Sequence, residues 1–127
     1  LAEKGAIVAD GFLETPWMDP SASQVDAAFF ASLSLRELSH VDFFALYRDM
    51  TERVLARNCA ELTGKIQLVT RSEEERREAL SQCREMEREL AILKAAIHKE
   101  TQFAHQVELN TKIKELETRL SRSVAAL

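Results

Sequence analysis

Between Ser72 and Leu127 the apolar side chains recur at spacings of three and four residues, which is the period of an α-helix. They form two series: Leu80, Cys83, Met86, Leu90, Leu93 and Ile97, and then Leu109, Ile113, Leu116 and Leu120. Each series is a seam of the coiled-coil type, but the two do not share a phase. The mismatch falls around residues 99–107. The pattern predicts an antiparallel helical hairpin over residues 72–127, with one stuttered helix as the alternative.

The start of this helical segment carries a capping signal. Ser72 is followed three residues later by Glu75, and this spacing is that of a capping box. Gly and Pro are absent from residues 72–127, and both residue types weaken helices. We therefore expect a linker over residues 65–71 and a helix from about Ser72.

A second helical pattern lies earlier in the chain. Phe43, Tyr47, Met50 and Val54 repeat at helical spacing, and Ser39 is placed as an N-cap. The pattern predicts a helix over residues 40–59, from about His40 to Cys59. Gly64 is expected to end this helix or its frayed last turn. Residues 22–38 fit either a helical turn or an extended stretch. The nearby aromatic cluster has few basic neighbours, so we expect it to pack in a core rather than stack on bases; its members are Phe29, Phe30, Phe43, Phe44 and Tyr47.

Residues 6–15 are rich in Val, Ile, Phe and Thr and predict one or two short strands. The expected fold class is α+β, mostly helical, with residues 1–64 as the C-terminal part of a mixed α/β domain. Isolated strands need partners, and the chain begins with Leu rather than Met. We therefore expect the remainder of a sheet upstream of this sequence.

Composition narrows the class of protein. Apolar residues make up 46% and charged residues 30% of the chain, which favours a packed core over disorder. The net charge of −4 speaks against direct nucleic-acid binding by this segment. No apolar run approaches a membrane span, so no membrane partner is expected. Cys59 and Cys83 do not form a disulfide framework and indicate reduced thiols in the cytoplasm.

No pattern in the chain indicates catalysis. There is no glycine-rich phosphate loop and no paired Cys-x-x-Cys, and His98 and His105 stand too far apart in sequence to pair on a helix as metal ligands. We therefore expect no catalytic residue, no bound metal and no cofactor, and enzymatic activity is the less favoured interpretation.

The segment from Lys99 to Asn110 is the most unusual in the sequence. Gln102, Gln106 and Asn110 would line up four residues apart on a helix, with Phe103 and Val107 beside them. Buried amides need hydrogen-bond partners, so this stripe predicts a specific contact. The contact is either internal to the hairpin or made with a partner protein, and both remain open at this point.

Three stretches resemble one bacterial family. Gly11–Trp17 is similar to a strand that ends in an aromatic residue, a Thr and a Trp, and Val41–Tyr47 to a helix containing Leu-Asp-x-Leu-Tyr. Lys99–Asn110 resembles the signature Lys-Glu-Lys-Gln-Phe-Asn-Arg-Gln-Val-Glu-Leu-Asn, with Thr101, Ala104 and His105 as departures. The family is the bacterial domain of unknown function 4391. The resemblance implies a chain of about twice this length, of which this is the C-terminal half, and genes beside a DNA methyltransferase and a helicase in restriction–modification or phage-defence clusters.

Together these observations predict an accessory protein–protein interaction subunit of such a system, acting through the hairpin and contacting a helicase or a DNA methyltransferase. The alternative is the scaffold of a nuclease-like enzyme whose active site lies in a missing N-terminal half. The same seams also fit a homo-oligomer formed through residues 72–127.

Overall fold

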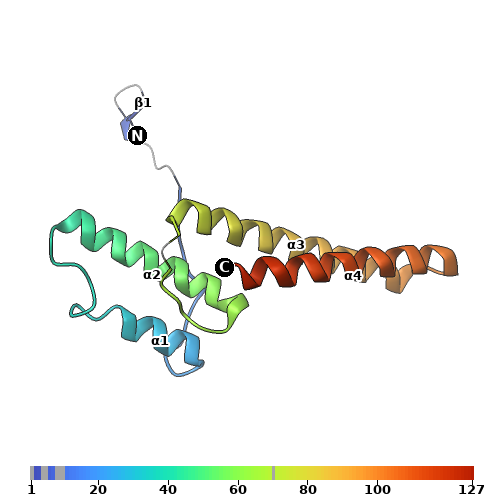
Figure 1. Ribbon diagram of the computed structural model, residues 1–127, viewed down its shortest axis with the longest axis horizontal. Helices are drawn as coiled ribbons and strands as arrows, with labels where there is room; N and C mark the ends of the chain where they lie inside the picture. The colour runs from blue at the N-terminus through green and yellow to red at the C-terminus, as the bar shows by residue number, and fades with distance from the viewer. Residues whose placement is uncertain (1, 4–5, 8–10, 70) are drawn as a thin grey trace. The chain divides into compact units, whose positions relative to one another are not determined.

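The computed structural model describes residues 2–3, 6–7, 11–69 and 71–127 (Figure 1). In these ranges the chain forms four helices: α1 (Gln24–Ser32), α2 (Phe43–Thr63), α3 (Glu73–Lys99) and α4 (Phe103–Ala125). The chain divides into two compact units, Leu1–Val69 and Thr70–Leu127. Each unit contains one pair of packed helices, α1 with α2 and α3 with α4. None of the described helices is both long and apolar enough to cross a membrane.

The expected α+β fold is wrong, because the described residues form an all-helical structure. The extended pairing they contain is a two-residue antiparallel ladder, β1 (Ala2–Glu3) against β2 (Ala6–Ile7), which is too short to build a sheet. Residues 11–15 of the expected strands have no regular secondary structure, and residues 8–10 lie outside the described part. The carbonyl of Glu14 accepts a hydrogen bond from Asn58 Nδ2 at 2.8 Å, so a side chain of α2 occupies the place of a neighbouring strand.

The two helices of the first unit are each capped by a side chain. Ser23 Oγ accepts from the backbone N–H of Asp26 at the start of α1, and Asp42 Oδ1 accepts from Ala45 N–H at the start of α2. The expected cap at Ser39 is wrong, because α2 begins at Phe43 and its N-cap is Asp42; Ser39 lies in the loop before it, where its N–H donates to Asp49 Oδ2 at 2.7 Å. Helix α2 therefore begins three residues later than the range 40–59 expected.

The end of α2 confirms the role expected for Gly64. Its φ of 86° lies in the left-handed region, which other residues adopt only with strain. Its N–H donates to the carbonyl of Ala60 at 2.8 Å, which satisfies one of the last carbonyls of the helix. Beyond it, the described residues of the expected linker, 65–69, have no regular secondary structure.

The interior of the first unit contains two arginines as well as apolar side chains. Arg53 is 6% exposed and donates to three backbone carbonyls, those of Ser32, Asp49 and Glu37, at 2.8, 3.1 and 3.1 Å. These carbonyls belong to the end of α1, to α2 and to the loop between them. One guanidinium therefore fixes the path of the chain from α1 into α2.

Arg57, one turn further along α2, holds the start of α1. It forms an ion pair with Asp26 at 2.9 Å, a second with Glu61, and donates to Met18 Sδ at 3.1 Å. Burial opposes the charge on Arg57, but the hydrogen bonds to Glu61 and Asp26 outweigh it and keep the pKa of Arg57 above its ordinary value. Other buried residues of this unit are Phe29, Leu38, Ala45, Leu55, Ala56, Asn58, Cys59 and Ala60.

The second unit is a pair of antiparallel helices. Ser72 Oγ accepts from Glu75 N–H at 3.2 Å, as expected for the cap of α3. Helix α3 ends at Lys99 and α4 begins at Phe103, so the chain reverses inside the stretch where the two seams change phase. Every residue of the two seams is buried or half-buried. Lys94 of α3 pairs with Glu117 of α4 at 3.1 Å, and Arg71, just before α3, donates to the carbonyl of Ala126, just after α4, at 2.7 Å.

Replacing Arg57 by Ala leaves the buried carboxylate of Asp26 without its cation. We expect the free energy of unfolding of the first unit to fall by about 3–5 kcal/mol. The matched control is Arg48→Ala, an exposed arginine of the same helix, for which a change within about 0.5 kcal/mol is expected. Urea unfolding followed by circular dichroism, together with amide hydrogen exchange in α1, measures both. Equal losses in the two variants would contradict the role given to Arg57.

Candidate functional site

The five residues predicted to make contacts lie at the tip of the hairpin, where α4 begins. Phe103 is 78% exposed and Val107 is 49% exposed. The residues Gln102 and Asn110 are also exposed, whereas Gln106 is half-buried. The first turns of α4 therefore present two apolar side chains and two amides to solvent.

The backbone at the tip is fixed by the carboxylate of Glu100. Its Oε1 accepts from the N–H of Thr101 at 3.0 Å and from the N–H of Gln102 at 2.9 Å. Gln102 occupies the N-cap position of α4 but makes no capping bond with its own side chain. The carboxylate thus satisfies backbone donors and places a negative charge at the positive end of the helix dipole.

The amide stripe divides into an internal and an external part. Gln106 Nε2 donates to the backbone carbonyl of Glu100 at 2.7 Å, which ties the second turn of α4 to the end of α3. Gln102 and Asn110 lie on the surface, where their side-chain amides can meet a partner. The sequence left open whether the stripe makes a contact inside the hairpin or with a partner protein. For Gln106 the contact is inside the hairpin.

The electrostatics of the tip follow from the same contacts. The N–H of Gln102 lowers the pKa of Glu100 most; the N–H of Thr101 and the neighbouring His105 add to this, against a smaller opposing effect of desolvation. His105 Nδ1 lies 3.6 Å from Glu100 Oε2. These contacts favour the ionised form of the Glu100 carboxylate, which accepts the two backbone N–H groups of the turn.

Chemically, the tip suits binding rather than catalysis. Phe103, Val107, Asn110 and Lys114 are spaced four, three and four residues apart, so they share one face of α4. In the ranges that the structure covers, no group of three or more His, Cys, Asp and Glu side chains could hold a metal ion. The face offers apolar contact, one amide and one cation.

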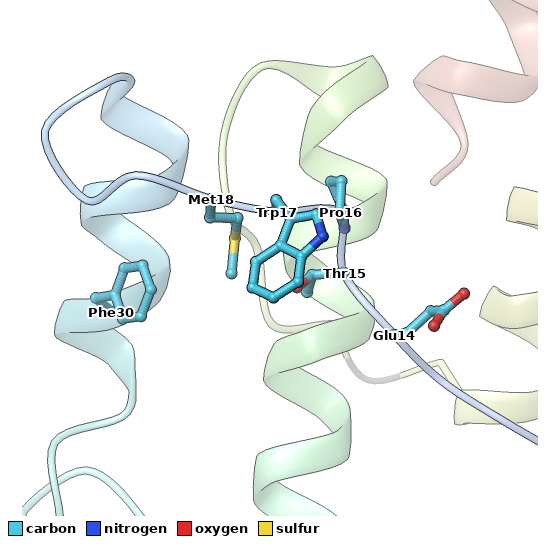
Figure 2. A pocket seen from close by; sticks show the side chains of 6 residues that line it. All are labelled: Glu14, Thr15, Pro16, Trp17, Met18 and Phe30. Atoms are coloured by element: carbon cyan, nitrogen blue, oxygen red, sulfur yellow. The ribbon is translucent and has the colours of Figure 1, made fainter.

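The first unit contains a hollow (Figure 2). It has a volume of about 640 Å³ and is lined by Glu14, Thr15, Pro16, Trp17, Met18 and Phe30. The segment that carries Trp17 and Met18 is held against α2 by the bonds from Arg57 to Met18 and from Asn58 to Glu14. Its size suits a small ligand, but of these lining residues Glu14 alone is ionisable, and in Figure 2 it points away from Trp17.

The expectation that the aromatic cluster packs in the core is wrong for four of its five members. Phe29 is buried, at 4% exposure, with its ring 5.4 Å from that of Phe30. The other members are exposed: Phe30 by 41%, Phe43 by 89%, Phe44 by 73% and Tyr47 by 67%. The sequence indicates an apolar face on α2, which carries Phe43, Phe44 and Tyr47. It does not show that α1 packs against a different face of α2.

Comparison with known proteins gives one result. A family model described as Domain of unknown function (DUF4391) matches residues 1–120. No curated protein and no solved structure matches the chain.

Replacing Gln106 by Ala removes the bond to the Glu100 carbonyl. We expect the free energy of unfolding of the hairpin to fall by about 1 kcal/mol, the typical contribution of an intramolecular hydrogen bond. Asn110→Ala is the matched control, because it removes an exposed amide from the same helix and should change the stability by less than about 0.5 kcal/mol. Thermal unfolding measured by circular dichroism distinguishes the two. An equal effect of both variants would show that the bond of Gln106 does not hold the turn.

The lowered pKa of Glu100 makes the turn sensitive to acid. The pKa lies below the ordinary value of 4.5, so the cap is fully formed above pH 4.5 and is lost as the pH falls through the folded-state pKa. We expect the amide proton shifts of Thr101 and Gln102 in NMR spectra to titrate below pH 4.5, and Glu100→Gln to abolish that titration. Glu115→Gln, at an exposed position of α4, should leave it unchanged. A midpoint at or above pH 4.5 would contradict the capping role.

Proposed function

This chain belongs to the Domain of unknown function (DUF4391) family, and from that premise we propose that it is an accessory protein–protein interaction subunit. The hairpin of α3 and α4 is the part that contacts the partner. Phe103, Val107, Gln102 and Asn110 form the contact surface, which we call the tip surface. Gln106 supports this surface from within.

The observation that carries this proposal is the exposure of Phe103, 78%, at a turn held by hydrogen bonds. Burying an aromatic side chain stabilises a protein strongly, so a phenylalanine left in water has the character of an interface anchor. Val107 extends the apolar area by one helical turn. Because the backbone beneath is already ordered, binding incurs little further loss of conformational entropy.

The polar part of the tip surface supplies orientation. Gln102 and Asn110 are exposed at the edge of the apolar pair, and each amide can both donate and accept a hydrogen bond. A partner that offers an apolar pocket with polar groups at its rim satisfies both parts. Such an arrangement is typical of the centre and rim of protein interfaces.

The assembly we propose is a bacterial restriction–modification or phage-defence system, with a helicase or a DNA methyltransferase as the partner. Support comes from the Lys99–Asn110 segment, whose resemblance to the family signature falls on the tip surface. Direct contact with nucleic acid is not part of the proposal, because the ten basic and eleven acidic side chains of residues 72–127 nearly cancel. We place the assembly in the cytoplasm, where the buried thiols of Cys59 and Cys83 stay reduced.

The test is a binding measurement with a helicase and a DNA methyltransferase of a restriction–modification or phage-defence system from the same genome, each purified separately. We expect one of them to bind, and Phe103→Ser together with Val107→Ser to weaken that binding at least tenfold, as loss of an interface anchor does. Isothermal titration calorimetry gives both dissociation constants.

Ile92→Ser is the matched control, since Ile92 is 69% exposed on α3 and does not belong to the tip surface. It should leave the dissociation constant unchanged. The proposal fails if neither protein binds, or if the Phe103 and Val107 variant binds as tightly as the unchanged chain.

A further inference from the structure

The first unit has an exposed apolar face of its own, which shares no residue with the tip surface. It consists of the start of α2 and the loop before it, and we call it the α2 face. Its six side chains and their exposed fractions are Leu35 68%, Val41 84%, Phe43 89%, Phe44 73%, Tyr47 67% and Met50 44%. Soluble monomers rarely expose so many neighbouring large apolar residues, and such patches mark interaction sites.

The α2 face is distinct from the side of α2 that packs inside the unit. Ala45 and Arg53 are buried, and Arg53 bonds the carbonyls of Ser32 and Glu37 on the α1 side. Phe43 and Tyr47 stand one turn apart on another side of the helix. The side of α2 that faces α1 thus makes the polar contacts of Arg53. The side that carries Phe43 and Tyr47 is exposed to solvent among the described residues.

The face contains both a hollow and side chains able to fill one. A cavity of about 350 Å³ is lined by Leu35, Ser39, His40, Asp42, Phe43 and Leu46. Phe44 and Tyr47 project from the same stretch of helix and are mostly exposed. This combination suits a two-fold symmetric interface, in which the same patch of both copies must be complementary to itself.

The spacing of the seam also suits a second copy. Phe43, Tyr47, Met50 and Val54 are separated by four, three and four residues, a series that reads the same in both directions. Two such helices running antiparallel therefore meet in one register along the whole seam.

The available area agrees with a stable dimer. Burying one Phe, Tyr or Trp removes about 150–250 Å² from water, so three aromatic and three aliphatic side chains at these exposures offer on the order of 800 Å² per copy. Specific interfaces of standard size bury about 800 Å² on each partner. We propose that the chain forms a two-fold symmetric homodimer in which the α2 faces of two copies pack against each other, with Phe44 and Tyr47 of each copy entering the hollow beside Phe43 of the other.

The experiment is sedimentation velocity of the full chain over about 1–100 µM, a range that detects micromolar dissociation constants. We expect the sedimenting mass to rise from that of one 14.4 kDa chain to twice that value. Phe44→Asp should raise the dissociation constant at least tenfold, because it places a carboxylate in an apolar interface. Tyr47→Asp is a second variant with the same expected result.

Two control variants distinguish this dimer from self-association through a different surface. Ile92→Asp, at an apolar position of α3 that is 69% exposed, and Phe103→Asp, at the hairpin tip, should leave the dimer intact. Unchanged circular dichroism spectra would show that the Phe44 and Tyr47 variants remain folded. A chain that is monomeric throughout, or a dimer that persists in the folded Phe44 and Tyr47 variants, would overturn the proposal. A dimer lost in the Phe103 variant instead would overturn it as well and place self-association at the tip. Because the α2 face and the tip surface share no residue, the dimer proposed here and the binding proposed for the tip surface can fail separately.

Discussion

Two buried guanidinium groups on one helix govern the structure of the first unit. Removing a charge from water is costly unless hydrogen bonds and opposite charge replace the solvent, so Arg53 and Arg57 must be surrounded by acceptors. Arg53 meets this need with three backbone carbonyls, and Arg57 with the carboxylates of Asp26 and Glu61. Because these acceptors lie on α1, on the loop and on α2, satisfying the two arginines determines where α1 can lie. The aromatic side chains of α2 are consequently left on another side.

The hairpin depends on a different constraint, the disagreement in phase between two apolar seams. A single straight helix would turn one of the seams into solvent, whereas a reversal at residues 100–102 lets both face inward. Such a short turn leaves backbone groups without helical partners. The side chains of Glu100 and Gln106 satisfy several of them, and the exposed Phe103 is held on a defined scaffold as a result.

The sequence was informative where local rules decide the outcome. The capping serine at Ser72 and the left-handed glycine at Gly64 depend on one turn of backbone each, and both were predicted. Over residues 11–15 the expected strands do not form, because extended sequences need neighbours, and the carbonyl of Glu14 bonds a side chain instead. The N-cap of α2 was misplaced because Ser39 and Asp42 are both residue types that favour the N-cap position, and spacing alone did not show that the side chain of Asp42 is the one that accepts from the first turn. At the tip, spacing alone identified the amide stripe but could not show which amide is internal.

The way Arg53 is bound also affects how freely the surrounding sequence can change. Its three acceptors are main-chain carbonyls of Ser32, Glu37 and Asp49, and every amino acid supplies such a carbonyl. Neutral substitution at positions 32 and 37 can therefore proceed over evolutionary time without breaking these bonds, provided that the backbone keeps its course. Arg57 is bound by side chains of one particular charge, so Asp26 can be exchanged only together with its partner. We therefore expect the residues at positions 32 and 37 to vary more among related sequences than Asp26 and its partner Arg57.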